Sequence, residues 1–420
     1  MKKVFFVLIA FLVAANLQSQ PFTVPAEEQS WLSKDRTFEM GLANVNVGFA
    51  NNFLTASEIF SDVLVIDLAN LSRGFNFAFD ANIRPLFFNY SAGRDRWGFG
   101  LDLGNTTVYG NLDVSGNLLH FRQTSGDQFG MGAAVFSDIG IPIFFHVDNV
   151  MDRRLRISLR PAWFVPIFYT VPSMRYTNRE VYRDGRNSTF VEIDFGARIH
   201  APMSLQPLFG DDQGGQGLSS QDITSALGFD FSLGLEFPLI SNLDVGVNFT
   251  NIPLSRATLA HYMEIRNQLL IDSSNMDLTS VINGDGFPDD FFSFESDEAV
   301  FGQDSLRIVR PFKMVFYANY RPLDRQILTI VPSLGFSVNP LFVQTVSLEA
   351  GVRAQGDFGN IFMPAISIGY EDQMWRNGFD FVLNLRVIEI GFGVSMQSQQ
   401  FVRSWQAAGL RANLGIKMGF

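Results

Sequence analysis

The chain has 420 residues and a formal net charge of −11, with 47% apolar residues, only 17% charged residues and 44 phenylalanines. The acidic balance argues against a nucleic-acid partner, which requires basic patches. Because the sequence contains no cysteine, disulfides, thiolate metal sites and cysteine nucleophiles are excluded. The charged fraction lies below that of a typical soluble chain, yet no mature segment has the length of an apolar transmembrane helix. These features favour a β-rich protein that carries its apolar surface on short segments.

The N-terminal stretch MKKVFFVLIAFLVAANLQSQ predicts a secretory signal peptide over residues 1–19. Two lysines precede an apolar run from Val4 to Ala15, and small and polar residues follow it. The run is too short and wrongly flanked for a membrane anchor, so we expect cleavage and export. Cleavage after Ser19 is preferred, and cleavage near Ala26 is the alternative.

Residues 20–74 are predicted to form a plug-like or periplasmic segment. Thr55 and Glu58 have the spacing of a helix capping box, and Gly74 is a suitable helix stop. Mixed structure ahead of the first clear strand is compatible with a segment that enters a barrel lumen. The alternative is that residues 42–50 pair into the barrel wall.

From Phe75 onwards, apolar and small polar residues alternate in runs that suit strands crossing a bilayer, about 9–11 residues each. One face of each run is rich in Phe, Leu and Val, and the other in Gly, Asn, Ser and Asp. Small polar residues suit a barrel lumen better than the surface of a soluble β-sandwich, which is the competing architecture. The sequence therefore predicts an all-β fold, a transmembrane antiparallel up-and-down β-barrel spanning residues 75–420, with about 14 strands and 16 as the alternative.

A long, partly helical insertion is predicted at residues 252–306, and long connections of this kind are usually functional. Within it, Asn283, Asp285 and Asp289 match part of a calcium-loop pattern. Val281 occupies the place of the leading aspartate, so an acidic surface turn is the preferred interpretation and no metal is expected.

The chain ends LRANLGIKMGF, with Leu414, Ile416 and Phe420 on one apolar face of a predicted strand. This ending resembles the C-terminal strand by which bacterial outer-membrane barrels are recognised by their assembly machinery. The resemblance implies an outer-membrane location, with outer-membrane lipid and the barrel-assembly machinery as partners.

The whole plan resembles the FadL-like barrels, which are transporters of the long-chain fatty-acid type with a plugged lumen. It also resembles uncharacterised barrels of spirochaetes and Bacteroidota. The resemblance implies passive transport of a hydrophobic or amphipathic small molecule. The alternatives are a porin-like diffusion channel and a structural or surface-interaction barrel.

The alternation also predicts which charged residues line the pore. They are Asp80, Arg84, Asp102, Glu192, Asp194, Arg198, Asp230, Glu236, Asp244, Glu349, Arg353, Asp380, Arg386, Arg411 and Lys417. The four histidines lack the spacing of a metal site or a catalytic triad. We therefore expect neither enzymatic activity nor a cofactor.

Overall fold

The computed structural model of the chain describes most of the residues after Thr37. The described residues are 37–51, 75–92, 97–114, 129–150, 153–183, 186–209, 224–272, 292–323, 327–338, 346–371, 374–398, 401–405 and 409–419. The predicted signal peptide, Phe420 and the calcium-loop candidates Asn283, Asp285 and Asp289 lie outside these ranges.

Twenty strands form one sheet. They are β1 (Phe38–Asn51), β2 (Phe75–Arg84), β3 (Leu86–Ala92), β4 (Trp97–Val114), β5 (Phe129–Gly140), β6 (Ile143–Val150), β7 (Arg153–Arg183), β8 (Arg186–Ala201), β9 (Gly228–Ile240), β10 (Leu243–Ser255), β11 (Ala257–Asp272), β12 (Phe292–Ser296), β13 (Val300–Ile308), β14 (Phe312–Tyr320), β15 (Leu328–Val338), β16 (Val346–Gly356), β17 (Phe362–Glu371), β18 (Met374–Asn384), β19 (Ile388–Ser398) and β20 (Gly409–Gly419). Two four-residue helices, α6 (Gln206–Phe209) and α9 (Phe401–Ser404), accompany them. Among the described residues, no helix has the length and hydrophobicity required to cross a membrane.

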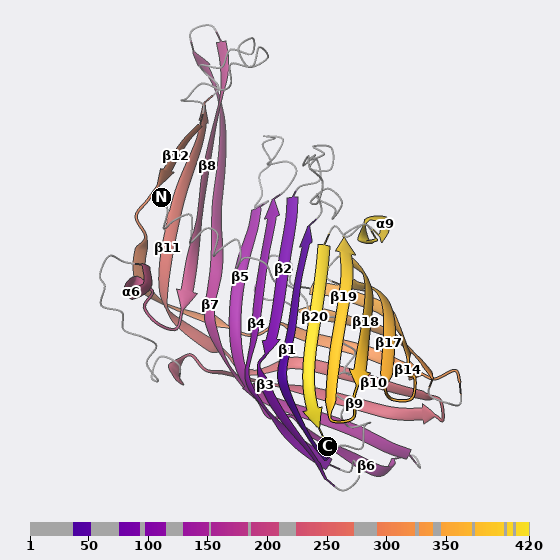
Figure 1. The fold of residues 1–420 in the computed structure, drawn as a ribbon. Coiled ribbons are helices and arrows are strands. Elements are labelled where there is room, and N and C mark those ends of the chain that lie inside the picture. The colour runs from indigo at the N-terminus through magenta and orange to yellow at the C-terminus, as the bar shows by residue number, and fades with distance from the viewer. Residues whose placement is uncertain are drawn as a thin grey trace.

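The sheet closes on itself because the last strand pairs with the first. Antiparallel β20 runs beside β1 from the pair Glu39 and Gly419 to the pair Ala50 and Gly409. The two strands lie next to each other in Figure 1, in yellow and indigo. A closed sheet has no edge strands, so the backbone groups of both terminal strands are satisfied within the wall.

In several cases two or three labelled strands occupy a single strand position in the wall. Their pairings join β2 with β3, β5 with β6, β8 with β9, β10 with β11, and β12 with β13 and β14. Counting each joined set once, the barrel has 14 antiparallel strands, as the sequence predicted.

The boundary of the wall differs from the prediction at the N-terminal side. β1 pairs with β2, β3 and β20, so the wall begins at Phe38 and not at Phe75. Residues 20–74 therefore do not form one plug, and the alternative in which 42–50 join the wall is correct. The prediction of a partly helical insertion at 252–306 is also wrong for its described residues, which continue β10 and form β11, β12 and β13. Residues 273–291 lie outside the description.

The interruptions within barrel strands occur largely at prolines. Pro85 separates β2 from β3, Pro142 lies between β5 and β6, and Pro311 directly precedes β14. Proline cannot donate a ladder hydrogen bond, so it is expected where a strand breaks or bulges. The neighbouring strand β4 carries a bulge at Gly104, which has a φ of 68°. These irregularities lie close in sequence to Arg84, Asp102, Asp138 and Arg310, whose contacts are described below.

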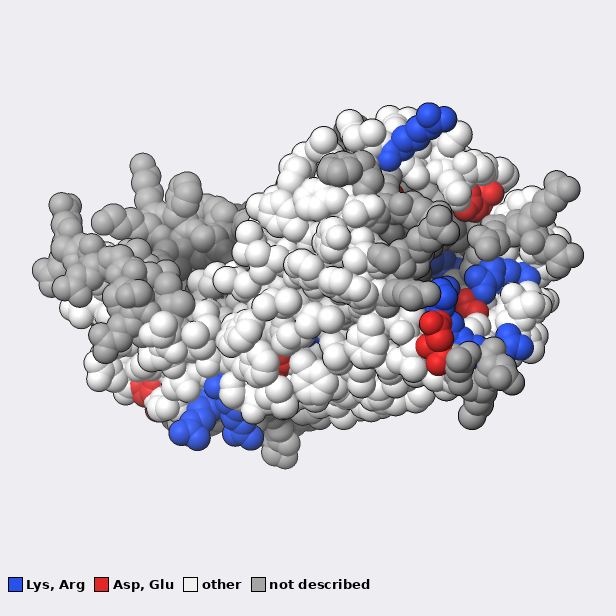
Figure 2. Space-filling model, turned by 90° about the horizontal axis from the view of Figure 1, so that it is seen from below, with Lys and Arg blue, Asp and Glu red and all other residues white. Residues whose placement is uncertain are grey.

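The outer surface is apolar over the described strands. Large apolar residues such as Leu334, Leu348 and Ile366 are more than half exposed, at 62%, 70% and 61%. Most of the described surface seen in Figure 2 carries no charged side chain. An exposed apolar area of this extent marks a surface that contacts lipid, as in transmembrane barrels.

The two ends of the barrel differ in their connections. The end at which β20 stops and β1 starts has short links, such as residues 151–152, 241–242 and 385–387. The opposite end has the longest ones, residues 52–74 and 273–291. At that end β7, β8, β11 and β12 rise above the other strands (Figure 1). In outer-membrane barrels the short turns are periplasmic and the longer loops extracellular, so a barrel of that class would have both termini on the periplasmic side.

Leu414 tests the predicted side-chain register of β20. Its side chain is 46% exposed on the outer surface, whereas the adjacent Asn413 faces inwards beside Gly393. Leu414→Arg should destabilise the barrel by about 2–4 kcal/mol if the site is near the bilayer midplane, because it places a cation in hydrocarbon. Asn413→Ser, the matched control, should be mild. Urea titration of refolding into lipid vesicles measures both variants, and equal stability would show that the assigned faces are wrong.

Candidate functional site

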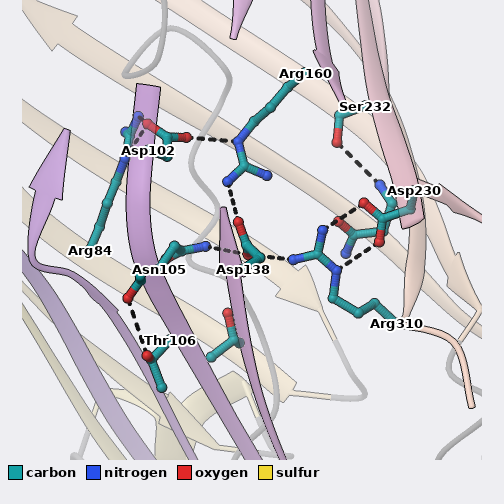
Figure 3. Close-up of polar contacts among 12 residues, drawn as sticks. Arg84, Asp102, Asn105, Thr106, Asp138, Arg160, Asp230, Ser232 and Arg310 are labelled. Carbon is teal, nitrogen blue, oxygen red and sulfur yellow. Dashed lines mark hydrogen bonds and ion pairs between the residues drawn. The ribbon is translucent and has the colours of Figure 1, made fainter. Parts of the chain in front are cut away.

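A set of alternating acidic and basic side chains crosses the barrel interior, and we call it the lumenal network (Figure 3). Its members are Arg84, Asp102, Asp138, Arg160, Asp230 and Arg310. Three aspartates and three arginines balance each other, so the network has no net charge. Its carboxylates are removed from solvent, with Asp102, Asp138 and Asp230 only 1–2% exposed.

Strand alternation and local breaks place these side chains. Asp102, Asp138 and Asp230 lie on inward-facing positions of β4, β5 and β9, so their carboxylates enter the lumen from three strands. Gly140 on β5 leaves the space that Arg160 occupies, since a Cβ there would lie 2.6 Å from the Arg160 guanidinium carbon. Arg310 lies in the break between β13 and β14, where it is free of the strand ladder.

Arg310 connects parts of the wall that are not neighbours in the sheet. Its Nε and Nη2 donate to the two carboxylate oxygens of Asp230 at 2.7 and 2.6 Å, and its Nη1 donates to Asp138. In the wall, β7, β9 and β10 separate β5 from β14. The Arg310–Asp138 contact therefore spans the barrel interior and does not follow the sheet.

Arg160 continues the network towards β4. Its Nη2 donates to Asp138 at 2.6 Å and its Nε donates to Asp102 at 2.8 Å. Arg84 donates to the other oxygen of Asp102, and Asn105 Nδ2 donates to Asp138 at 2.9 Å. Every aspartate of the network thus accepts at least two charge-assisted hydrogen bonds, which are stronger than bonds between neutral groups.

An aromatic cluster lies against the network on the same inner face. The guanidinium carbon of Arg310 is 5.0 Å from the ring centroid of Phe164, a cation–π distance. Phe164, Phe136 and Tyr109 follow each other edge to face, with centroids 6.0 and 6.1 Å apart. Leu259 is packed into the same buried cluster. Ion pairs and aromatic rings therefore lie side by side on the inner face of the wall.

A second network lies on the other side of the barrel, and we call it the rim network. Its members are Asp80, Lys313, Glu349, Glu371, Arg376 and Arg411. Lys313 Nζ lies 2.7 Å from a carboxylate oxygen of both Glu349 and Glu371, and Arg376 also pairs with Glu371. Arg411 on β20 pairs with Asp80 on β2, across β1.

The two networks share two strand positions of the wall, that of β2 and that of β13 and β14. Lys313 follows Arg310 by three positions, and Asp80 precedes Arg84 by four. Paired charges therefore surround the lumen. Buried ion pairs contribute little net stability compared with apolar packing of the same shape, whereas breaking one costs about 3–5 kcal/mol.

Most of the other predicted pore-lining residues form an ion pair or a hydrogen bond with a side chain outside the two networks. Glu236 pairs with Arg156, Asp244 with Arg321, and Arg353 with Asp380. Arg198 binds Glu264 at 2.7 Å on β8 and β11, and Gln268 donates to Asp194 at 3.1 Å. Lys417 Nζ lies 4.0 Å from Glu389 Oε1. Glu192 belongs to β8, but its side chain lies outside the description.

Arg386 is the exception, because it does not lie in the wall. It occupies the turn between β18 and β19, where it is exposed and has a φ of 71°. The apolar pattern changes parity between Leu385 and Ile388, and the structure places a turn at this change. A pore-lining role for Arg386 is therefore not correct.

Six members of the two networks are not among the predicted pore-lining residues: Asp138, Arg160, Arg310, Lys313, Glu371 and Arg376. Asp138 and Arg160 were recognisable as charged inward positions of predicted strands. Arg310 was harder to recognise, because the adjacent Val309 and Pro311 interrupt the alternation around it. Among the described residues, no group of three or more His, Asp or Glu side chains is arranged to hold a metal ion.

The fold and the paired-charge interior define the chain as a transmembrane β-barrel whose interior is crossed by buried ion pairs. No protein-family model matches the chain, and no curated protein matches it in sequence.

In fold the chain is similar to several solved transport proteins. The P. putida toluene transporter TodX is 9% identical with a TM-score of 0.45, covering 92% of this chain and 90% of that chain. The Ralstonia pickettii toluene transporter TbuX is 10% identical with a TM-score of 0.43, covering 91% and 89%. A Pseudomonas aeruginosa FadL homologue is 10% identical with a TM-score of 0.42, covering 92% and 91%.

Proposed function

We propose that the chain is an outer-membrane barrel that passes hydrophobic or amphipathic small molecules passively through an occluded lumen. The observation that carries the proposal is the contact of Arg310 with Asp138 and Asp230 across the barrel interior. In this proposal, the lumenal network has the role that the sequence analysis gave to an N-terminal plug.

The aromatic cluster supports an apolar solute. Tyr109, Phe136 and Phe164 lie on the inner face directly beside the charged groups, so the closed region has both an apolar and a polar side. Small-molecule sites are typically apolar with a few polar groups that fix orientation. A solute would have to loosen the ion pairs to pass, which makes entry selective.

A porin-like diffusion channel is the second candidate. The inner faces of β15, β16 and β17 carry small polar residues, including Ser333, Ser347 and Ser367. Such a lining would suit hydrated solutes if an open passage lay beside the networks. A surface-interaction barrel is the third candidate, favoured by the strands that rise above the wall in Figure 1.

The proposed route to the membrane follows from the chain ends. A cleaved signal peptide would export the chain, and the assembly machinery would recognise the terminal strand through Leu414, Ile416 and Phe420. β20 supports this role because it closes the wall against β1.

Permeability of cells that express the protein distinguishes the first two candidates. In a Gram-negative host, entry of the apolar fluorophore 1-N-phenylnaphthylamine should rise on expression. Entry of a polar β-lactam, measured by its periplasmic hydrolysis, should stay unchanged. The reverse pattern would support the porin, and no change in either would favour the surface-interaction barrel. An equally abundant barrel from the host, expressed in the same way, controls for general damage to the membrane.

A further inference from the structure

Helix α9 covers part of the outer wall near the extracellular end of β18 and β19. Asn377 Nδ2 donates to Ser404 Oγ at 2.6 Å, and Ser404 Oγ donates to the carbonyl oxygen of Phe401 at 2.5 Å. Asn377 alternates with Arg376, which faces inwards to Glu371. Asn377 therefore points out of the barrel, and α9 lies on the outer face (Figure 1).

The hydrogen bond accounts for a polar residue on the apolar surface. Asn377 is 7% exposed and Ser404 is fully buried, although both belong to the outer side of the wall. A buried amide without a partner would be costly in a lipid environment. The hydrogen bond between Asn377 and Ser404 instead holds α9 against the wall, and both side chains are covered there.

Three apolar side chains at α9 and directly after it are exposed among those that the structure describes. Phe401, Val402 and Trp405 are 44%, 71% and 55% exposed. Phe401 packs edge to face on Trp375 with centroids 5.0 Å apart, and Trp375 contacts Tyr370 at 5.2 Å. Tryptophan and tyrosine concentrate where the hydrocarbon meets the headgroups, so this aromatic group marks the membrane interface.

The apolar surface of α9 is continuous with the lipid-facing wall. Phe379 lies two residues beyond Asn377 on the same face of β18 and is 45% exposed, and Phe392 of β19 is 41% exposed. A short amphipathic helix at this level suits the boundary between acyl chains and headgroups. It does not suit bulk water, where three large apolar side chains would remain solvated.

We propose that α9 is an interfacial anchor that inserts Phe401, Val402 and Trp405 among the acyl chains of the outer leaflet. The anchor fixes how deeply the extracellular ends of β18 and β19 lie in the membrane. This inference needs only the transmembrane barrel and is independent of which solute passes through the lumen.

The absence of cysteine from the chain makes a direct test possible. A nitroxide spin label is attached to Val402→Cys in the full mature chain, folded into dioleoylphosphatidylcholine vesicles. Accessibility to oxygen and to a water-soluble nickel chelate then reports depth. Labels on Phe379→Cys and Asp357→Cys provide the reference positions in the apolar wall and in a periplasmic turn, where Asp357 is partly exposed.

The label at position 402 should favour oxygen over the nickel chelate, at a depth between the two references. Accessibility equal to that of position 357 would overturn the proposal and leave a water-exposed surface for another protein. A second variant, Asn377→Ala in the Val402→Cys background, should raise label mobility while the barrel stays heat-modifiable. Unchanged mobility would overturn the assigned role of the Asn377–Ser404 hydrogen bond.

Discussion

Deleting residues 38–51 should abolish the folded barrel. These residues are β1, which pairs with β20 along one edge and with β2 and β3 along the other. Without β1, two wall strands would each present an unpaired edge at membrane depth. Each unsatisfied backbone group in hydrocarbon costs several kcal/mol, so the open sheet should not persist. Loss of heat-modifiable migration in gels and of strand circular dichroism in lipid would show this outcome.

The matched control is a deletion of residues 20–36, which precede β1. That variant should fold, because every wall pairing in the described residues begins after Thr37. A deletion of residues 20–72 removes β1 as well and should behave as the shorter deletion of β1. If it instead formed a heat-modifiable barrel, β1 would be dispensable and the wall would begin at Phe75.

The second large effect concerns Arg310. Arg310→Met should destabilise the folded state by about 3–5 kcal/mol, because it leaves Asp230 buried without its arginine. Single-channel conductance of the folded fraction in planar bilayers should also rise, since the contact between Asp138 and Asp230 through Arg310 is lost. Denaturant titration and bilayer recordings measure the two effects separately.

The double variant Arg310→Met with Asp230→Asn separates charge burial from occlusion. It removes both members of the bidentate pair, so much of the lost stability should return. Conductance should remain high because nothing bridges the lumen at this position. A folded double variant with wild-type conductance would show that the lumenal network does not close the passage.

Strand alternation explains why much of the wall was predictable. On β20, Leu410 and Leu414 face outwards while Arg411 faces inwards to Asp80, as a period of two requires. The same rule located Asp102 and Asp230. It failed at Arg386, since a turn interrupts the period, and at residues 252–306, where polar strands beyond the wall resemble a loop.

The position of β1 was only partly visible in the sequence. Val45, Val47 and Phe49 alternate with Asn44, Asn46 and Gly48, which allowed these residues to join the wall. The register shift between Gly41 and Ala43 interrupts the pattern. The choice between wall and plug depends on whether β20 has another partner, which is a long-range property of the closed sheet.

The sequence by itself determined the barrel class, the outward and inward faces of most strands, and the count of about 14 strands, because each follows from local alternation and the even-number rule. Only the tertiary structure decided where the barrel closes and which charged side chains meet inside it. Arg310 and Asp138 are 172 residues apart, and their contact exists because the closed sheet brings β5 and the break between β13 and β14 within reach of one arginine side chain. No local pattern encodes a distance across a lumen, since that distance depends on how the whole sheet curves.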